Sequence, residues 1–145
     1  MYKIVVVGTD GSPTADKAVE AAADIARGWG SSLQIVTAFR APRAGMGAVA
    51  GVDMVDSGAG QAMVEEAARA VVEEAVKKHG TGLQAEAYAG RGNPDDVILK
   101  RAQEINADLI VVGSKGMKGA RRYLGSVPNS VAHGAHCAVL VVKTD

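Results

Sequence analysis

Short apolar runs alternate along this chain with longer segments of helical periodicity. The first run, Ile4–Val7, consists of β-branched residues and is typical of a strand that is buried on both faces of a sheet. Similar runs predict strands at residues 33–39, 83–89, 109–112 and 138–142. Strands that alternate with helices favour a parallel sheet with right-handed crossovers. We therefore expect an α/β fold, with residues 1–145 forming a single domain around an open five-stranded parallel sheet with helices on both faces.

Two of the expected helices begin with the same signal. Ser12-Pro13 and Asn93-Pro94 each place a capping side chain before a proline at the first helical position, where a missing N–H costs nothing. Apolar residues at helical spacing predict the faces that these helices and residues 61–79 turn toward the core. These residues are Ala18, Ala22, Ile25, Trp29, Val64, Ala67, Ala68, Val71, Val72, Ala75, Val76, Val97, Ile98 and Ile105. A further short helix is expected from Ser126 to Ala132.

The segment from Arg40 to Gly60 differs in kind from the rest of the chain. It is rich in Gly and Ala and has no sustained hydrophobic period. A structureless loop of about 20 residues is unusual inside a compact domain and is often functional. We expect residues 40–60 to form a mobile loop.

Charge and hydropathy exclude several classes of protein. Lys plus Arg number 16 and Asp plus Glu number 16, so a zero net charge argues against nucleic acid and anionic membranes as partners. No segment approaches the roughly 20 apolar residues of a membrane span, and the amino end lacks the pattern of a signal peptide. The single cysteine, Cys137, fits a reducing compartment. We expect a cytoplasmic protein.

Ligands of open α/β sheets bind beyond the carboxyl ends of the strands, where the strand order reverses. This rule directs attention to residues 8–12, to Ala38 and to the segment that begins at Gly113. That segment is rich in glycine and basic side chains, and Gly113, Gly116 and the Gly125-Ser126 pair offer backbone amides and a hydroxyl to an anion. A cradle for phosphate and a solvated surface turn both remain open on these residues alone.

Other side chains near these loops also have two interpretations. Asp10 could accept hydrogen bonds from ribose hydroxyls or could cap its own turn. Ala38 could form a flat wall for a base. His133, His136 and Cys137 have some features of a metal site, but no fourth ligand is evident and we expect no metal. The P-loop pattern G-x-x-x-x-G-K-[ST] and the dinucleotide pattern G-x-G-x-x-G are absent.

Four short sequences together resemble the universal stress protein family. They are V-V-V-G-T-D-G-S at residues 5–12, G-x-P at 92–94, A-D-L-I-V-V-G-S at 107–114 and L-G-S-V-P-N-S-V at 124–131. The resemblance spans nearly the whole chain and is weakest at residues 40–60. It implies a Rossmann-like fold of the adenine nucleotide alpha-hydrolase type. The nucleotide-binding branch carries G-x2-G-x9-G-[ST], whereas eight residues separate Gly116 from Gly125 here, so this loop is one residue shorter.

What the resemblance implies is a site for ATP or another adenine nucleotide, such as AMP or cyclic AMP, with Mg²⁺ accompanying ATP. By position, Gly8, Thr9 and Asp10 would line adenine and ribose, Ala38 would contact the base, and Val112 would pack nearby. The residues assigned to the phosphates are Gly113, Gly116, Gly125, Ser126 and Val127, and Ser114 is counted among the nucleotide-binding residues. Valine at Gly113 or Gly116 is then predicted to lower affinity without preventing folding.

The resemblance favours a regulatory stress-response protein that forms homodimers through the last strand, residues 138–142. An enzyme that hydrolyses ATP slowly is the first alternative. It lacks an evident general base, because no acidic residue lies between Val111 and Val142 and Asp10 is expected on the ribose side. A dimerisation module that binds no nucleotide is the second alternative. We expect weak ATPase activity at most.

Overall fold

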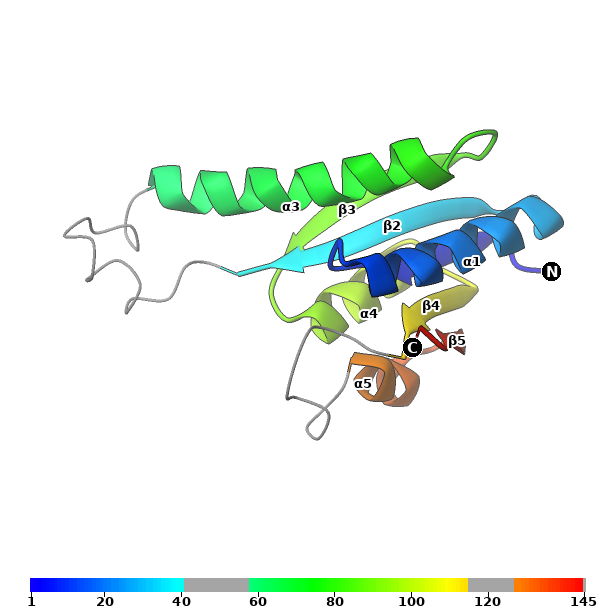
Figure 1. Ribbon diagram of the computed structural model, residues 1–145. Helices are drawn as coiled ribbons and strands as arrows, with labels where there is room; N and C mark the ends of the chain where they lie inside the picture. The colour runs from blue at the N-terminus through cyan, green and yellow to red at the C-terminus, as the bar shows by residue number, and fades with distance from the viewer. Residues whose placement is uncertain (41–57, 115–126, 145) are drawn as a thin grey trace.

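The computed structural model describes residues 1–40, 58–114 and 127–144 and shows a parallel sheet between two layers of helices (Figure 1). Five strands form the sheet: β1 (Ile4–Gly8), β2 (Ser32–Phe39), β3 (Ala85–Arg91), β4 (Leu109–Gly113) and β5 (Ala138–Val142). The helices of the described residues are α1 (Pro13–Trp29), α3 (Gly58–His79), α4 (Pro94–Glu104) and α5 (Val127–Gly134).

All neighbouring strands run parallel, in the order β3-β2-β1-β4-β5. β1 is central and consists of Val5, Val6 and Val7 flanked by two half-buried residues. The three valines are fully buried because helices cover both faces of the sheet. The predicted five-stranded parallel sheet is thus confirmed, and β3 and β5 form its two edges.

Two apolar clusters hold the helices against the sheet. On one face, Val5 and Val7 pack with Ala18 and Ala22 of α1 and Val72 of α3. A second set of contacts on the opposite face joins the sheet to α4 and α5; it includes Val6, Val97, Ile98, Ile110, Val112 and Val131. The prediction of helices on both faces is therefore confirmed.

The start of α1 follows the sequence signal, and the start of α4 follows it in part. Ser12 is the N-cap of α1, and its Oγ accepts a hydrogen bond of 3.2 Å from the Ala15 amide. Asn93 has the extended backbone of an N-cap but makes no capping bond with its side chain. The side-chain amide of Asn93 instead donates to Asp96 Oδ2 at 3.3 Å. Both helices begin at a proline, as predicted.

α3 is longer and less buried than its sequence predicts. It begins at Gly58, so the expected loop of residues 40–60 loses its last three residues to the helix, and residues 41–57 lie outside the described part. Only Gly60 and Val72 are buried along α3, and Ala67, predicted to face the core, is exposed. The physical reason is that α3 covers the margin of the sheet, where it packs on β2 and β3 and leaves one flank to solvent (Figure 1).

Trp29 and β3 also differ from their predictions. Trp29 is 52% exposed, because it ends α1 and contacts Tyr2 edge-to-face at 5.9 Å instead of entering the core. β3 begins two residues later than predicted, because the Leu83 amide donates to the Gly80 carbonyl and keeps Leu83 in a turn. β3 continues through Arg91, which pairs with Phe39 of β2. In the described ranges, no helix combines the length and the apolar character needed to cross a membrane.

Asp108 joins the beginnings of β1 and β4. Its Oδ2 accepts hydrogen bonds from the backbone amides of Lys3 at 2.8 Å and Ile4 at 2.9 Å. The bond from the Ile4 amide, followed by that from Lys3, lowers the pKa of the Asp108 carboxyl below its ordinary value, against a smaller opposing effect of burial. The ionised side chain therefore stabilises the central strands of the sheet.

We expect Asp108→Ala to lower the free energy of unfolding by about 1–3 kcal/mol near pH 7, because it leaves two backbone amides without their acceptor. Because the folded pKa lies below the unfolded one, this contribution is fully present above about pH 4 and is lost as the pH falls through the folded pKa. Urea unfolding between pH 7 and pH 3 measures it. Asp108→Asn keeps an acceptor but should flatten the pH dependence, and Asp24→Ala, at an exposed position of α1, should change little. Equal stability of Asp108→Ala and Asp24→Ala would contradict this role.

Candidate functional site

The strand order reverses between β1 and β4. From β1 the chain proceeds outward to β2 and β3 on one side and later to β4 and β5 on the other. Val7 pairs with Val111, so Gly8 and Val112 lie side by side at the carboxyl ends of β1 and β4. This is the position at which open α/β sheets form their ligand crevice. The structure therefore brings together two of the loops that the sequence analysis selected.

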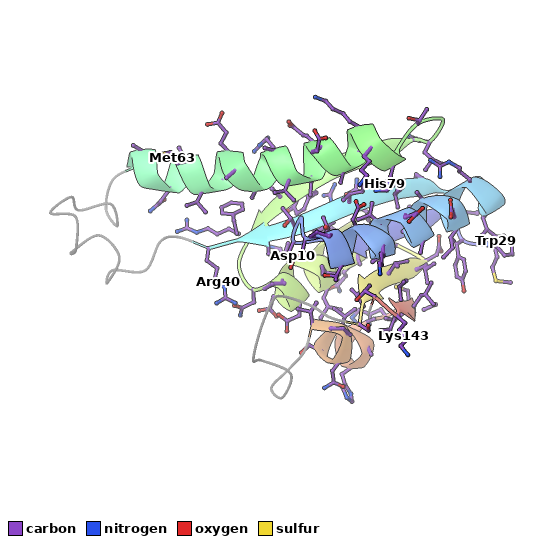
Figure 2. All side chains as sticks on the ribbon, in the orientation of Figure 1. Asp10, Trp29, Arg40, Met63, His79 and Lys143 are labelled. Atoms are coloured by element: carbon purple, nitrogen blue, oxygen red, sulfur yellow. The ribbon has the colours of Figure 1, made fainter. Side chains whose placement is uncertain are left out.

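The turn after β1 is fixed by its own side chains. The Thr9 amide donates to the Val36 carbonyl at 2.9 Å, and Thr9 Oγ1 accepts from the Gly11 amide at 3.1 Å. Asp10 Oδ1 accepts from the Ser12 amide at 2.9 Å. Asp10 is exposed at the start of α1 (Figure 2), and its Oδ2 has no hydrogen-bond partner within residues 1–40, 58–114 and 127–144. Asp10 thus caps its turn and still offers one carboxylate oxygen outward.

Gly11 connects this turn to α3. Its φ of +80° lies in the left-handed region, which glycine adopts without strain. A Cβ at this position would lie 3.0 Å from Val71 Cγ1 of α3. The turn that carries Asp10 therefore rests directly on α3, the helix that follows residues 41–57.

Gly8, Ala38 and Val112 line the side of the sheet covered by α4. Val112 is 2% exposed and belongs to the core cluster there, and Ala38 packs against the same cluster. A Cβ on Gly8 would overlap Ile98 Cδ1. Glycine at this position therefore lets α4 approach the end of β1, and the Val112 side chain serves the core.

The end of β4 is occupied by protein contacts that the sequence did not indicate. The Ser114 amide donates to the Val142 carbonyl at 2.7 Å, and Ser114 Oγ accepts from the Thr144 amide at 3.1 Å. A Cβ on Gly113 would lie 3.0 Å from Thr144 Cγ2 and 3.8 Å from Ala18 Cβ. The prediction that valine at Gly113 would spare folding stays a prediction, and these contacts add an expected loss of stability, because the added methyl groups would meet packed side chains. Thr144 is the residue that sequence reasoning missed, since nothing near it marks a buried threonine.

α5 is described from Val127 to Gly134, and Ser126, the predicted first residue of this helix, lies outside the described residues. Val127 is half-buried against the α4 side of the core, and Pro128 in the first turn has no N–H to offer. Gly116, Gly125 and Ser126 lie outside the described residues, so their assignment to phosphates stays a prediction.

A hollow of about 330 Å³ lies between α3 and the ends of β2 and β3. Phe39, Arg40, Gln61, Tyr88 and Arg91 contribute to its wall. Ala38 is not part of this wall, because it packs on the side of the sheet that α4 covers. No sequence pattern indicated the hollow, because its wall combines residues from α3, β2 and β3.

The three candidate metal ligands do not form a cluster. α5 ends at Gly134, so His133 lies on the helix and His136 lies beyond it. Burial, with a smaller contribution from Asp108, raises the pKa of the Cys137 thiol. Over the described ranges, no group of three or more His, Cys, Asp or Glu side chains is arranged to hold a metal ion.

Comparison with known proteins gives one consistent result. A family model described as the universal stress protein family matches residues 1–143. Universal stress protein Rv1636 of Mycobacterium tuberculosis is 38% identical over 147 residues, covering 99% of this chain and 97% of that protein. Universal stress protein YxiE of Bacillus subtilis is 31% identical over 152 residues, covering 99% and 100%. A crystal structure of a universal stress protein in complex with cAMP superposes with a TM-score of 0.78 at 34% identity, covering 99% of both chains.

Proposed function

This chain belongs to the universal stress protein family, and from that premise we propose that it binds an adenine nucleotide at the carboxyl ends of β1 and β4. ATP is the first candidate, with AMP and cyclic AMP next. We further propose that it acts as a regulatory homodimer in a stress response. The observation that carries this proposal is the strand reversal that sets the Thr9–Asp10 turn beside Gly113.

The described side chains suit the nucleoside part of such a ligand. Asp10 Oδ2 faces outward and could accept from ribose hydroxyls, and the Thr9 hydroxyl keeps a proton to donate. Ala38 presents a small apolar surface near the end of β2, on the side of the sheet that α4 covers, against which a base could pack. ATP, AMP and cyclic AMP share adenine and ribose. The 34% identical universal stress protein crystallised with cAMP supports a ligand of this class.

The phosphate part depends on residues beyond Gly113. Gly113 would contribute its backbone, while Ser114 already gives its amide to Val142. Gly116, Gly125, Ser126 and Val127 keep the phosphate roles that the family pattern assigns. Mg²⁺ would accompany ATP and balance part of its charge.

Titration calorimetry with ATP, AMP, cyclic AMP and GTP tests the proposal. We expect the adenine nucleotides to bind and GTP to bind at least roughly tenfold more weakly, because a site that fits adenine meets different hydrogen-bonding groups at C2 and C6 of guanine. Mass spectrometry of the purified protein should detect any adenine nucleotide that it retains. Absence of binding by all three adenine nucleotides would contradict the proposal and favour a dimerisation module.

A measurement of ATP turnover distinguishes the enzymatic alternative from a nucleotide-binding regulator. Asp10 has one oxygen engaged with the Ser12 amide and is assigned to the ribose, which makes it a poor general base for attack on a phosphate. We expect phosphate release from ATP, with Mg²⁺ present, to stay near the rate without protein. Release that is stimulated many-fold by the protein would support an ATP hydrolase instead.

The proposed dimer uses β5, which is one edge of the sheet. Leu140 and Val141 are 38% and 44% exposed, and β5 has no charged residue. The opposite edge, β3, carries Glu86 and Arg91, and charges of this kind discourage pairing between edges. The apolar edge therefore supports a partner strand at β5.

We expect Val141→Lys to raise the dissociation constant of the dimer roughly tenfold or more, because each subunit would bring a charge into an apolar contact. Ala87→Lys, at an exposed position of the opposite edge strand β3, is the matched control and should leave the dimer intact. Sedimentation velocity over a range of concentrations measures both. A wild-type monomer at every concentration, or equal dissociation of the two variants, would contradict dimerisation through β5.

A further inference from the structure

The segment that follows β5 folds back against the end of β4. Thr144 is 1% exposed and is one of the few buried polar residues in the described part of the chain. Its amide donates to Ser114 Oγ at 3.1 Å, and its carbonyl accepts from Lys17 Nζ of α1 at 3.3 Å. The methyl group of Thr144 fills the space where a Cβ on Gly113 would lie, at 3.0 Å. We call Lys17, Ser114 and Thr144 the clasp.

The clasp lies where β4 leads into the glycine-rich segment. Ser114 is the last described residue before that segment, and both its amide and its hydroxyl are bonded to the chain that follows β5. A Cβ on Gly113 would also lie 3.8 Å from Ala18 Cβ of α1, so Thr144 and Ala18 occupy the same side of Gly113. The direction in which the chain leaves β4 is therefore set by residues about 30 positions later in the sequence.

Burial of a polar residue costs free energy unless its hydrogen bonds are made, and the clasp provides partners for the Thr144 backbone. Lys17 Nζ donates to the Thr144 carbonyl although 127 positions separate the two residues in the sequence. Such contacts fix the backbone of Gly113 and Ser114 in one place. Ligand sites that depend on backbone groups need that fixation, because small displacements weaken several contacts together.

We propose that Thr144 is a positioning residue for the nucleotide site: through the clasp it holds the end of β4 in the geometry that accepts the ligand. This inference rests on the proposed function. By thermodynamic linkage, a ligand that binds more tightly to the clasped state must in turn stabilise the clasp. Because Thr144 directly follows β5 and Lys143, the clasp also joins the site to the proposed dimer edge.

Two variants open the clasp from opposite sides. Ser114→Ala removes the acceptor of the Thr144 amide, and Lys17→Met removes the donor to its carbonyl. We expect each to weaken ATP binding roughly three- to tenfold, as for the loss of one hydrogen bond. Ser114→Thr keeps the hydroxyl group and Lys17→Arg keeps a donor to the Thr144 carbonyl, so both should bind ATP about as tightly as the wild type. Lys100→Met removes one positive charge at an exposed position of α4 and serves as the control.

The dependence on ionic strength distinguishes an electrostatic effect of Lys17 from a positioning effect. Lys17 could attract phosphates at a distance, and such attraction weakens at high ionic strength, whereas positioning persists. We therefore expect the Lys17→Met effect to remain at 0.5 M salt, a roughly threefold to fivefold higher ionic strength than physiological. An effect that disappears at high salt would contradict positioning by Lys17.

Hydrogen exchange of the Thr144 amide gives a readout without activity. In the ligand-free wild type we expect this amide to be protected, in Ser114→Ala to exchange roughly tenfold faster, and in the ATP complex to exchange more slowly than in the free protein. An unprotected Thr144 amide, or ATP binding that is insensitive to both variants, would overturn the inference alone. Failure of the wild type to bind any adenine nucleotide would contradict the proposed function together with it.

Discussion

Gly113→Val is expected to lower the free energy of unfolding by about 1–3 kcal/mol, because a side chain there overpacks the region between β4 and α1. The first added carbon would lie 3.0 Å from Thr144 Cγ2, and the two branch methyl groups would reach further toward Thr144 and Ala18. Thr144 would have to give by a few tenths of an ångström in a site where it is 1% exposed. Its bonds with Ser114 and Lys17 would be strained by that shift.

Denaturant unfolding of the wild type and four variants, Gly113→Val, Thr144→Ser, their combination and Gly28→Val, tests this expectation. Thr144→Ser removes the methyl group that meets the new side chain, so the double variant Gly113→Val/Thr144→Ser should recover part of the loss. Gly28→Val is the matched control, because a Cβ at Gly28 meets nothing within 4 Å and valine is tolerated in a helix at least as well as glycine. The account is wrong at this point if Gly113→Val unfolds like Gly28→Val, or if the two changes at Gly113 and Thr144 are simply additive.

Asp10→Asn is expected to weaken ATP binding roughly ten- to hundredfold while the protein keeps its stability. The amide oxygen of asparagine can still accept from the Ser12 amide, so the turn after β1 is preserved. The amide nitrogen cannot accept from a ribose hydroxyl, so the outward contact is lost. Asp10→Ala removes both functions and should bind at least as weakly and also unfold more easily.

Calorimetry and urea unfolding on the same samples separate the two roles of Asp10. Asp24→Asn, an exposed aspartate on α1, is the control for the loss of one negative charge and should bind ATP like the wild type. If Asp10→Asn binds ATP as tightly as Asp24→Asn, Asp10 serves the turn alone and the ribose contact is wrong.

Local patterns predicted the elements of the fold well. Apolar β-branched runs located β4 and β5 to within a residue, because such runs in a doubly covered sheet have few alternatives. The Ser12-Pro13 signal located the start of α1, because capping depends on neighbours in sequence. Helical spacing misplaced Trp29 and Ala67, because it indicates a common face and not how far the sheet extends beneath it.

The site was less predictable, because its geometry comes from contacts between distant segments. The sequence could indicate that Gly8–Asp10 and Gly113 end strands, but the adjacency of β1 and β4 follows from strand order. The glycine at position 113 has a packing role that becomes visible only with Thr144 in place. Likewise, Ser114 was assigned to the nucleotide site, and the sequence did not indicate that its amide donates to the Val142 carbonyl.

Amide chemical shifts recorded during an ATP titration test most directly whether the nucleotide occupies the switch point. We predict that the largest shifts occur at Gly8, Thr9, Asp10 and Gly113, with little change at Lys3 and Ile4, which lie at the opposite end of β1 and are bonded to Asp108. The claim is contradicted if saturating ATP leaves these four amides unmoved, or if the largest shifts appear at the end of the sheet that Asp108 holds.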